Sequence, residues 1–213
     1  MAKYPVPGRV KTRLARVLGP ERACELFRAF ILDLADRLRP LPYRVTWAYS
    51  PPAAPFPRLV GGARCRAQRG RDLGARMAHA LAAEFAERRQ SVLVIGADTP
   101  HVPEATLAEA ATMLCGRADL VLGPAADGGY YLIGLRAPAP SLFTGITWGT
   151  DGVLAATLER AGVRGLRTHL LPSSFDIDEV DDLVRLRALI AGGHVDLPRT
   201  ALLLSGGCVA ARS

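Results

Sequence analysis

The chain has 213 residues, a length that fits one domain of ordinary size with a sizeable buried core. With 49% hydrophobic and 22% charged residues, its composition is that of a folded globular protein and excludes a disordered or fibrous chain. Its apolar runs fall short of the ~20 residues that cross a bilayer, and residues 1–13 are too polar for a signal peptide. We therefore expect a cytoplasmic protein with no membrane partner.

The charge balance raises the question of an acidic partner. The formal net charge is +7 and the isoelectric point is near 9.7, which suits nucleic acid, a membrane surface or a phosphorylated small molecule. The 27 basic residues include only two lysines, Lys3 and Lys11, and the arginines are scattered instead of forming a stripe interleaved with aromatic residues. We do not expect nucleic acid to be the partner.

Helix-like and strand-like segments alternate along the chain, which is typical of an α/β protein. In chain order we expect helix Glu21–Leu38, strand Tyr43–Tyr49, a proline-rich loop Ser50–Pro57, strand Arg64–Gln68, helix Asp72–Arg89, strand Ser91–Ile95, helix Pro103–Leu114, strands Asp119–Leu122 and Tyr130–Leu135, helix Asp151–Ala161, strand Arg167–Leu171 and helix Glu179–Ile190. The pattern predicts a single three-layer α/β/α domain over residues 1–191, with a mainly parallel sheet. Residues 192–213 would form a C-terminal tail whose role the sequence does not reveal.

Ligands of such sheets bind beyond the carboxyl ends of the strands, so polar residues there are the first candidates for chemistry. Near the N-terminus, Gly8 would let the backbone approach a ligand, and Arg9, Lys11 and Arg13 could converge on a phosphate. The segment is not a P-loop, because the second glycine of that motif is missing. Its alternative interpretation is a basic, solvated arm.

The segment GADTP, residues 96–100, follows the most apolar strand of the chain. A carboxylate at Asp98 would face the crevice, where Mg²⁺ or Mn²⁺ could bridge it to a diphosphate. Alternatively, Asp98 caps the helix that starts near Pro103.

Two further acidic segments lie closer to the C-terminus. Asp127 precedes two glycines between predicted strands, where Asp-Gly is also a common hairpin turn. Asp176 and Asp178 flank one apolar residue and so point the same way on an extended chain, which could supply a second metal ligand. The alternative for Asp178 is that it caps the following helix.

A resemblance to a known family spans roughly residues 3–190. It is carried jointly by six motifs in this order: KYPVPGRVKTRL, GRDLGARM, GADTP, DGGYYLIGL, ITWGTDGVL and DIDEVDDL. They resemble a bacterial glycosyltransferase-like family linked to arsenosugar biosynthesis and formerly described as a domain of unknown function. That family is similar to the nucleotide-diphospho-sugar transferase (GT-A) superfamily, including the molybdenum-cofactor and 2-phospho-L-lactate guanylyltransferases. The resemblance implies a GT-A-like sheet.

The resemblance also implies roles for individual residues. Metal binding would fall to Asp98, Asp176 and Asp178, and catalysis to Asp98, Asp127 and Lys11. The nucleotide would be held by Gly8, Arg9, Lys11, Arg13, Arg71, Asp72 and Gly74. The acceptor or sugar side would be lined by Asp127, Gly128, Gly129, Tyr130 and Trp148.

Two departures from the family pattern bear on these roles. Almost nothing precedes Lys3 where relatives have a hydrophobic strand, so either the true start lies upstream or the first strand is stunted. The metal motif also has one aspartate, Asp98, followed by Thr99 and Pro100 in place of a full Asp-x-Asp. Metal binding would then depend on the distant acidic segment.

The leading functional hypothesis is a metal-dependent transferase that uses a nucleotide sugar, with Mg²⁺ or Mn²⁺, to glycosylate a small acceptor. The first alternative is a nucleotidyltransferase, similar to the guanylyltransferases, that activates a small phosphorylated substrate and releases diphosphate. The second is a non-catalytic nucleotide- or RNA-binding module. A homodimer is one assembly that the sequence allows.

Overall fold

The computed structural model describes residues 1–205, and these fall into two compact units, each built from segments far apart in the sequence. The first, which we call the sheet unit, comprises Met1, Arg66–Gly96 and Val102–Asp176. The second, the helical unit, comprises Ala2–Cys65, Ala97–His101 and the described residues from Ile177 to Ser205. None of the helices within the described residues has the length and apolar character needed to span a bilayer.

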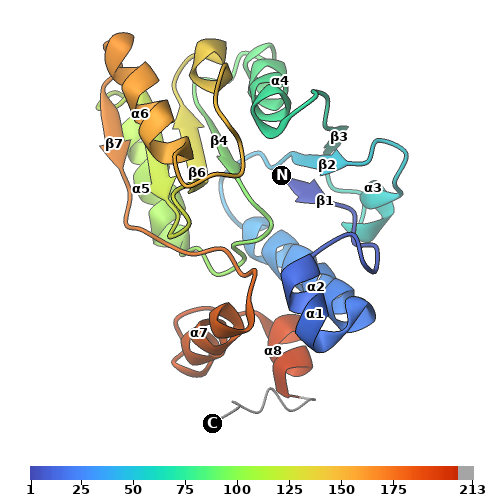
Figure 1. The fold of residues 1–213 in the computed structure, drawn as a ribbon. Coiled ribbons are helices and arrows are strands. Elements are labelled where there is room, and N and C mark those ends of the chain that lie inside the picture. Colours follow the sequence, from blue (N-terminus) through green and yellow to red (C-terminus); the bar gives the residue numbers. More distant parts are fainter. Residues whose placement is uncertain (206–213) are drawn as a thin grey trace. The chain divides into compact units, whose positions relative to one another are not determined.

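The sheet unit is organised around a four-stranded sheet with the order β4-β6-β5-β7 (Figure 1). Its strands are β4 (Val92–Ile95), β5 (Leu120–Pro124), β6 (Tyr130–Leu135) and β7 (Thr168–Leu170). β5 and β7 are parallel, whereas β6 runs antiparallel to both β4 and β5. The turn between β5 and β6 is too short for the crossover that a parallel pair requires, so β6 must reverse direction.

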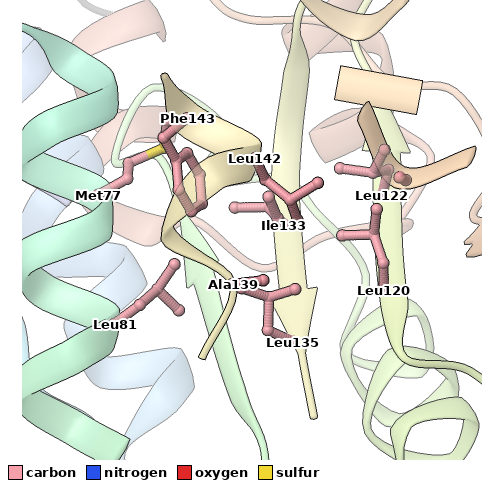
Figure 2. Packing of buried hydrophobic residues seen from close by; sticks show 10 residues of the cluster. Met77, Leu81, Leu120, Leu122, Ile133, Leu135, Ala139, Leu142 and Phe143 are labelled. Carbon is pink, nitrogen blue, oxygen red and sulfur yellow. The ribbon is translucent and has the colours of Figure 1, made fainter. Parts of the chain in front are cut away.

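Helices cover both faces of this sheet. On one face, Leu120, Leu122, Ile133 and Leu135 form a buried cluster with residues of α4 (Leu73–Phe85), η1 (Pro140–Phe143) and α6 (Val153–Val163) (Figure 2). Side chains alternate along a strand, so Gly134 belongs to the other face, where a Cβ would come within 2.9 Å of Leu114 in α5 (Glu104–Leu114). The α/β class with flanking helices is thus confirmed.

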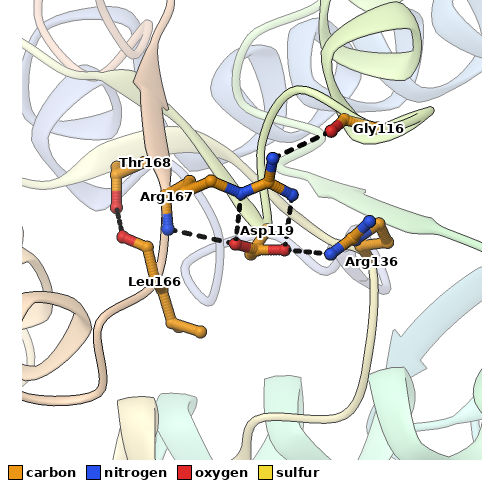
Figure 3. Close-up of polar contacts among 6 residues, drawn as sticks. All are labelled: Gly116, Asp119, Arg136, Leu166, Arg167 and Thr168. Carbon is orange, nitrogen blue, oxygen red and sulfur yellow. Dashed lines mark hydrogen bonds and ion pairs between the residues drawn. The ribbon is translucent and has the colours of Figure 1, made fainter.

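An ion-pair network joins three strand ends of the sheet unit (Figure 3). Asp119, just before β5, accepts hydrogen bonds from Arg167 Nε at 3.0 Å and from the Arg167 backbone at 3.1 Å. It also pairs with Arg136, just after β6. Hydrogen bonds from Arg167 hold the pKa of Asp119 well below its ordinary value, although burial opposes the shift.

The helical unit holds the strands β1 and β2 and the remaining helices. β1 (Ala2–Lys3) has only two residues and pairs in parallel with β2 (Trp47–Ser50). The order of this sheet is β1-β2-β3, and of β3 (Cys65–Ala67) only Cys65 belongs to the helical unit. The helices are α1 (Thr12–Leu18), α2 (Pro20–Leu38), α3 (Phe56–Leu59), α7 (Val180–Ala191) and α8 (Pro198–Ser205).

The helix α8 lies within the segment that the sequence predicts as a tail. Asp33 of α2 is completely buried and accepts hydrogen bonds from the Thr200 backbone at 2.9 Å and the Thr200 hydroxyl at 2.7 Å. It also accepts from the backbone and the guanidinium of Arg199. These bonds satisfy donors at the start of α8 and fix it to α2. Residues 206–213 of the predicted tail lie outside the described residues.

Candidate active site

The basic loop predicted to bind phosphate leads from β1 into α1 in the helical unit. Gly8 has φ +73°, a left-handed conformation that suits glycine, and the Arg9 backbone N–H donates to the Val6 carbonyl at 3.0 Å. Lys11 also has a left-handed conformation, with φ 47° and ψ 47°, at the residue that precedes α1. A lysine in this region carries backbone strain of about 1–2 kcal/mol, so its surroundings must hold it there.

The Lys11 side chain lies between two of the predicted metal ligands. Its Nζ donates to Asp178 Oδ1 at 3.0 Å, forms an ion pair with Asp98, and lies 5.5 Å from the centre of the Phe27 ring. The lysine side chain is 3% exposed, whereas the side chains of Asp98 and Asp178 are 46% and 48% exposed. Burial by itself lowers the pKa of Lys11, but the two carboxylate charges outweigh it and raise the pKa above its ordinary value. We call these three residues the ion-pair cluster.

Backbone contacts bring the two carboxylates together from distant parts of the chain. The Ile177 N–H donates to the Asp98 carbonyl at 3.1 Å, so the two segments lie side by side. Ile177 is fully buried between Asp176 and Asp178, as the predicted alternation requires. Asp182 accepts from the backbone N–H groups of Asp178 at 3.0 Å and Glu179 at 2.8 Å, which fixes the start of α7.

The alternative interpretation, in which Asp98 and Asp178 cap the helices that follow them, is wrong for both residues. The helix α5 begins after Pro103 without a side-chain cap, so Asp98 does not cap it. The capping residue of α7 is Glu179, in a capping box with Asp182, and not Asp178. Because the capping residue lies one position after Asp178, the Asp178 carboxylate is free of the helix start and contacts Lys11 instead.

The other predicted cations of the loop are more exposed. Arg13 pairs with Glu179 at 3.4 Å, and both side chains are about two-thirds exposed, so this ion pair adds little stability. Arg9 is exposed. Convergence of Arg9, Lys11 and Arg13 on a phosphate therefore stays a prediction.

In the sheet unit, the predicted acceptor-side turn is tightly packed. Asp127 Oδ1 accepts from the Gly129 N–H at 2.9 Å, as in an ordinary Asp-Gly turn. Gly128 has φ +85°, and a Cβ there would come within 2.1 Å of the Asp151 carbonyl oxygen. The Gly128 carbonyl accepts from the Leu154 N–H at 2.9 Å, so the turn is fixed to the first turn of α6.

Trp148 connects this turn with the predicted nucleotide side. Its ring meets Tyr130 edge-on, with centroids 6.4 Å apart, and lies so close to Gly74 that a Cβ there would be 2.4 Å from the indole. Phe143 stacks on Trp148 at a centroid separation of 6.4 Å. Burial raises the pKa of Tyr130 well above its ordinary value. We call Gly74, Gly128, Tyr130 and Trp148 the turn–aromatic cluster.

Arg71 and Asp72 lie at the start of α4. Asp72 is the capping residue of this helix, because its side chain accepts a hydrogen bond from the Ala75 N–H at 2.8 Å. Arg71 is exposed and pairs with Asp72 at 3.4 Å. The structure thus gives Asp72 a local structural role beside its predicted one.

Sequence reasoning missed the residues that support the predicted ones. Phe27 beneath Lys11 belongs to the apolar stripe of α2, and Phe143 behind Trp148 belongs to a short 3₁₀ helix. Neither carries a signal that would distinguish it from an ordinary core residue. Only their contacts in the folded chain reveal the supporting role.

The predicted metal ligands fit a divalent cation in their chemistry. Within residues 1–205 no group of three or more His, Cys, Asp or Glu side chains is placed to hold a metal ion. Asp98 and Asp178 nevertheless offer two half-exposed carboxylates on one ammonium, and Mg²⁺ is commonly bound by one or two carboxylates together with substrate phosphates. Asp176 belongs to the sheet unit, and its role as a third ligand stays a prediction.

Comparison with solved structures defines the class of fold. The chain is similar to a proposed nucleotide-diphospho-sugar transferase of Desulfovibrio desulfuricans G20, with 36% identity, a TM-score of 0.87, and coverage of 95% of this chain and 90% of that one. Molybdopterin-guanine dinucleotide biosynthesis protein A of Archaeoglobus fulgidus has a TM-score of 0.54 at 18% identity, over 90% of this chain and 97% of its own. A 4-diphosphocytidyl-2C-methyl-D-erythritol synthase has a TM-score of 0.54 at 14% identity, over 89% of this chain and 96% of its own.

These similarities show the nucleotide-diphospho-sugar transferase fold. Residues 33–150 match the family described as an uncharacterized protein conserved in bacteria (DUF2064). The chain belongs to this family. No curated protein matches it.

Proposed function

We propose that the protein is a metal-dependent transferase that moves a sugar from a nucleotide sugar to a small acceptor. The observation that carries this proposal is the ion-pair cluster, in which a buried lysine lies between two half-exposed carboxylates. Such a group offers both signs of charge to a metal-bound diphosphate. The similarity to a proposed nucleotide-diphospho-sugar transferase at 36% identity supports the choice of donor.

The chemical problem of this transfer is the negative charge that builds on the leaving phosphate. The bond between the sugar and the diphosphate oxygen breaks, and its electron pair leaves with the nucleoside diphosphate. Lys11 and Arg13 would offset this charge. A Mg²⁺ or Mn²⁺ ion bound at Asp98 and Asp178, with Asp176 as a further candidate ligand, would supply Lewis-acid stabilisation of the phosphate oxygens.

On the acceptor side, a hydroxyl oxygen forms the new bond to the sugar and must lose its proton. We propose that Asp127 accepts this proton as the general base. Asp127 is an exposed carboxylate whose Oδ1 accepts a hydrogen bond from the Gly129 N–H at 2.9 Å. Gly128, Gly129, Tyr130 and Trp148 would line the acceptor, while Gly8, Arg9, Arg71, Asp72 and Gly74 would contact the nucleotide. These roles, the arsenosugar link and a homodimer remain part of the proposal.

The alternative is nucleotidyl transfer, in which a nucleoside triphosphate is attacked by a phosphorylated substrate and diphosphate leaves. It is supported by the fold that the chain shares with the two less similar structures, whose names concern a guanine dinucleotide and a diphosphocytidyl compound. The same cluster would serve it, because the leaving group is again a phosphate. A non-catalytic nucleotide- or RNA-binding module is the remaining candidate, and it would form no product.

Products distinguish these reactions. Incubation with labelled nucleotide sugars and candidate acceptors should release a nucleoside diphosphate, whereas release of inorganic diphosphate from a triphosphate would favour nucleotidyl transfer. Salt-sensitive RNA binding without thermal stabilisation by any nucleotide would favour the binding module.

The variant Asp98→Ala tests the site itself. We expect it to lose manganese-dependent stabilisation by nucleotide in a thermal-shift assay while remaining folded by circular dichroism. Asp36→Ala is the matched control, because Asp36 is a similarly exposed carboxylate (42%) of the same unit. Manganese-dependent stabilisation of Asp98→Ala by nucleotide as large as that of the wild type would contradict the assignment.

A further inference from the structure

The ion-pair cluster has an uneven distribution of charge and exposure. Its two carboxylates carry a charge of −2 against +1 on Lys11, and they are about half exposed while the lysine is 3% exposed. A cation arriving from solvent would therefore meet carboxylate oxygens before it meets the ammonium. The residual negative charge would attract such a cation.

The backbone segments that carry the two carboxylates are held by contacts that do not involve the lysine. The Ile177 N–H bonds to the Asp98 carbonyl at 3.1 Å, and the capping box of Glu179 and Asp182 fixes the backbone beside Asp178. Buried Ile177 anchors the same segment in the core. The backbone positions of Asp98 and Asp178 would therefore stay close together if the ammonium left.

Lys11 is held in the opposite way. Its backbone is in the left-handed region, it makes no side-chain cap to α1, and its ammonium contacts the two carboxylates and the Phe27 ring. The ion pairs therefore help to hold the strained backbone, and a competing positive charge on the carboxylates would weaken them.

We propose that Lys11 is the resident counter-cation of Asp98 and Asp178, and that a divalent cation replaces it there and releases the ammonium for an anionic ligand. Metal binding and anion binding would then be coupled, because each ligand favours the state with the lysine released. This inference rests on the proposed function in placing a divalent cation at Asp98 and Asp178 and in naming the anion as a phosphate of the nucleotide.

The chain offers a direct probe because its only lysines are Lys3 and Lys11. Trace acylation of the wild-type protein with an amine-reactive acetyl ester, read by peptide mass spectrometry, reports both side chains at once. Lys11 should react slowly without metal and severalfold faster in Mg²⁺, at matched ionic strength. Exposed Lys3 is the internal control and should keep its rate. In Asp98→Asn/Asp178→Asn, Lys11 should react fast whether or not Mg²⁺ is present.

A second measurement uses Lys11→Met, with Lys3→Met as its matched control. Removal of the competing ammonium should tighten Mn²⁺ binding about tenfold, measured by electron paramagnetic resonance without nucleotide. Lys3→Met should bind Mn²⁺ as the wild type does. If Lys11→Met does not fold, the acylation experiment decides alone.

An Mg²⁺-independent acylation rate of Lys11, or Mn²⁺ binding to Lys11→Met that is equal or weaker, would overturn the inference. A nucleotide that binds the wild type with metal while the Lys11 rate stays constant would overturn it and leave the proposed function standing. Release of Lys11 by Mg²⁺ in a protein that binds no nucleotide would support the exchange and reject the proposed function.

Discussion

The ion-pair cluster of the helical unit and the turn–aromatic cluster of the sheet unit are built from different interactions. In the first, Lys11 is held by the opposite charges of Asp98 and Asp178. In the second, close packing leaves no space for a side chain at Gly74 and Gly128. An added Cβ would lie 2.4 Å from Trp148 at Gly74 and 2.1 Å from the Asp151 carbonyl oxygen at Gly128. The ion-pair cluster should therefore be sensitive to changes of charge, pH and metal. The turn–aromatic cluster should be sensitive to the added volume of a single methyl group.

The same contrast extends beyond the two clusters. Buried charges of the helical unit, such as Asp33, join segments that are distant in the sequence. In the sheet unit, a charged network surrounds Asp119 at the strand ends, whereas close packing of apolar side chains fills the interior (Figures 2 and 3). Steric changes in the sheet unit and buried-charge changes in the helical unit should thus be the most damaging.

The largest effect is expected from Gly128→Ala. The substitution adds a methyl group where φ is +85° and where the Asp151 carbonyl would lie 2.1 Å away, so it should cost about 4 kcal/mol of unfolding free energy. Gly149→Ala is the control, because Gly149 has φ +82° but open space around it, and should cost only about 1–2 kcal/mol. Urea denaturation measures both. Equal losses would show that conformation alone, and not packing, defines the turn.

The next effect concerns a buried carboxylate. Asp33→Ala leaves the donors of Arg199 and Thr200 without their acceptor and should cost about 3 kcal/mol. Asp36→Ala removes a carboxylate that pairs with the same Arg199 at 2.7 Å, but at the surface, and should cost less than about 1 kcal/mol. Chemical denaturation of both variants tests the difference. A similar cost for the two would mean that burial does not strengthen the link between α2 and α8.

The pH dependence of stability should carry a signature of the helical unit. Burial, and then the charge of Arg37, lowers the pKa of His101 to about 4, below its ordinary value of 6.5. Between pH 4 and pH 6.5 the unfolded chain binds more protons than the folded chain. The stability that neutral His101 contributes is therefore complete above pH 6.5 and is lost as the pH falls toward 4. From pH 7 to pH 5 the wild type should lose about 2 kcal/mol through this residue.

His101→Gln should flatten this part of the pH profile, measured by urea denaturation at several pH values. The same substitution at the exposed His79, in the sheet unit, is the control. An unchanged slope in His101→Gln would mean that the buried imidazole is not what makes the helical unit sensitive to acid.

Local sequence patterns predicted most elements of the sheet unit. The strand Tyr130–Leu135 is found with the predicted bounds, and Asp72 caps α4 as its position before an apolar stripe indicates. Such elements carry their own periodicity and their own start signal. The direction of β6 was harder to predict, because it depends on the length of the preceding turn and not on the strand itself.

The missed elements of the helical unit depend on distant partners. The seven-residue α1 starts at Lys11 without a capping side chain, so no local signal marks it. The anchor of α8 is Asp33, more than 160 residues earlier. In the same way, the sequence indicated Asp98 and Asp178 as candidates for one site, but the lysine between them became evident only from the folded chain.

The smallest effect is expected at the charged edge of the sheet unit. A substitution there tests whether loss of a charge, instead of loss of close packing, destabilises this unit. Arg136 pairs with Asp119 at exposed strand ends, and Arg167 binds the same carboxylate through Nε at 3.0 Å and Nη2 at 3.1 Å. Arg136→Ala should therefore cost less than about 1 kcal/mol, and less still in high salt, because the remaining guanidinium and water satisfy Asp119. The free energy of unfolding at low and high salt measures this. A salt-insensitive loss as large as that of Asp33→Ala would mean that charge, and not close packing, also organises the sheet unit.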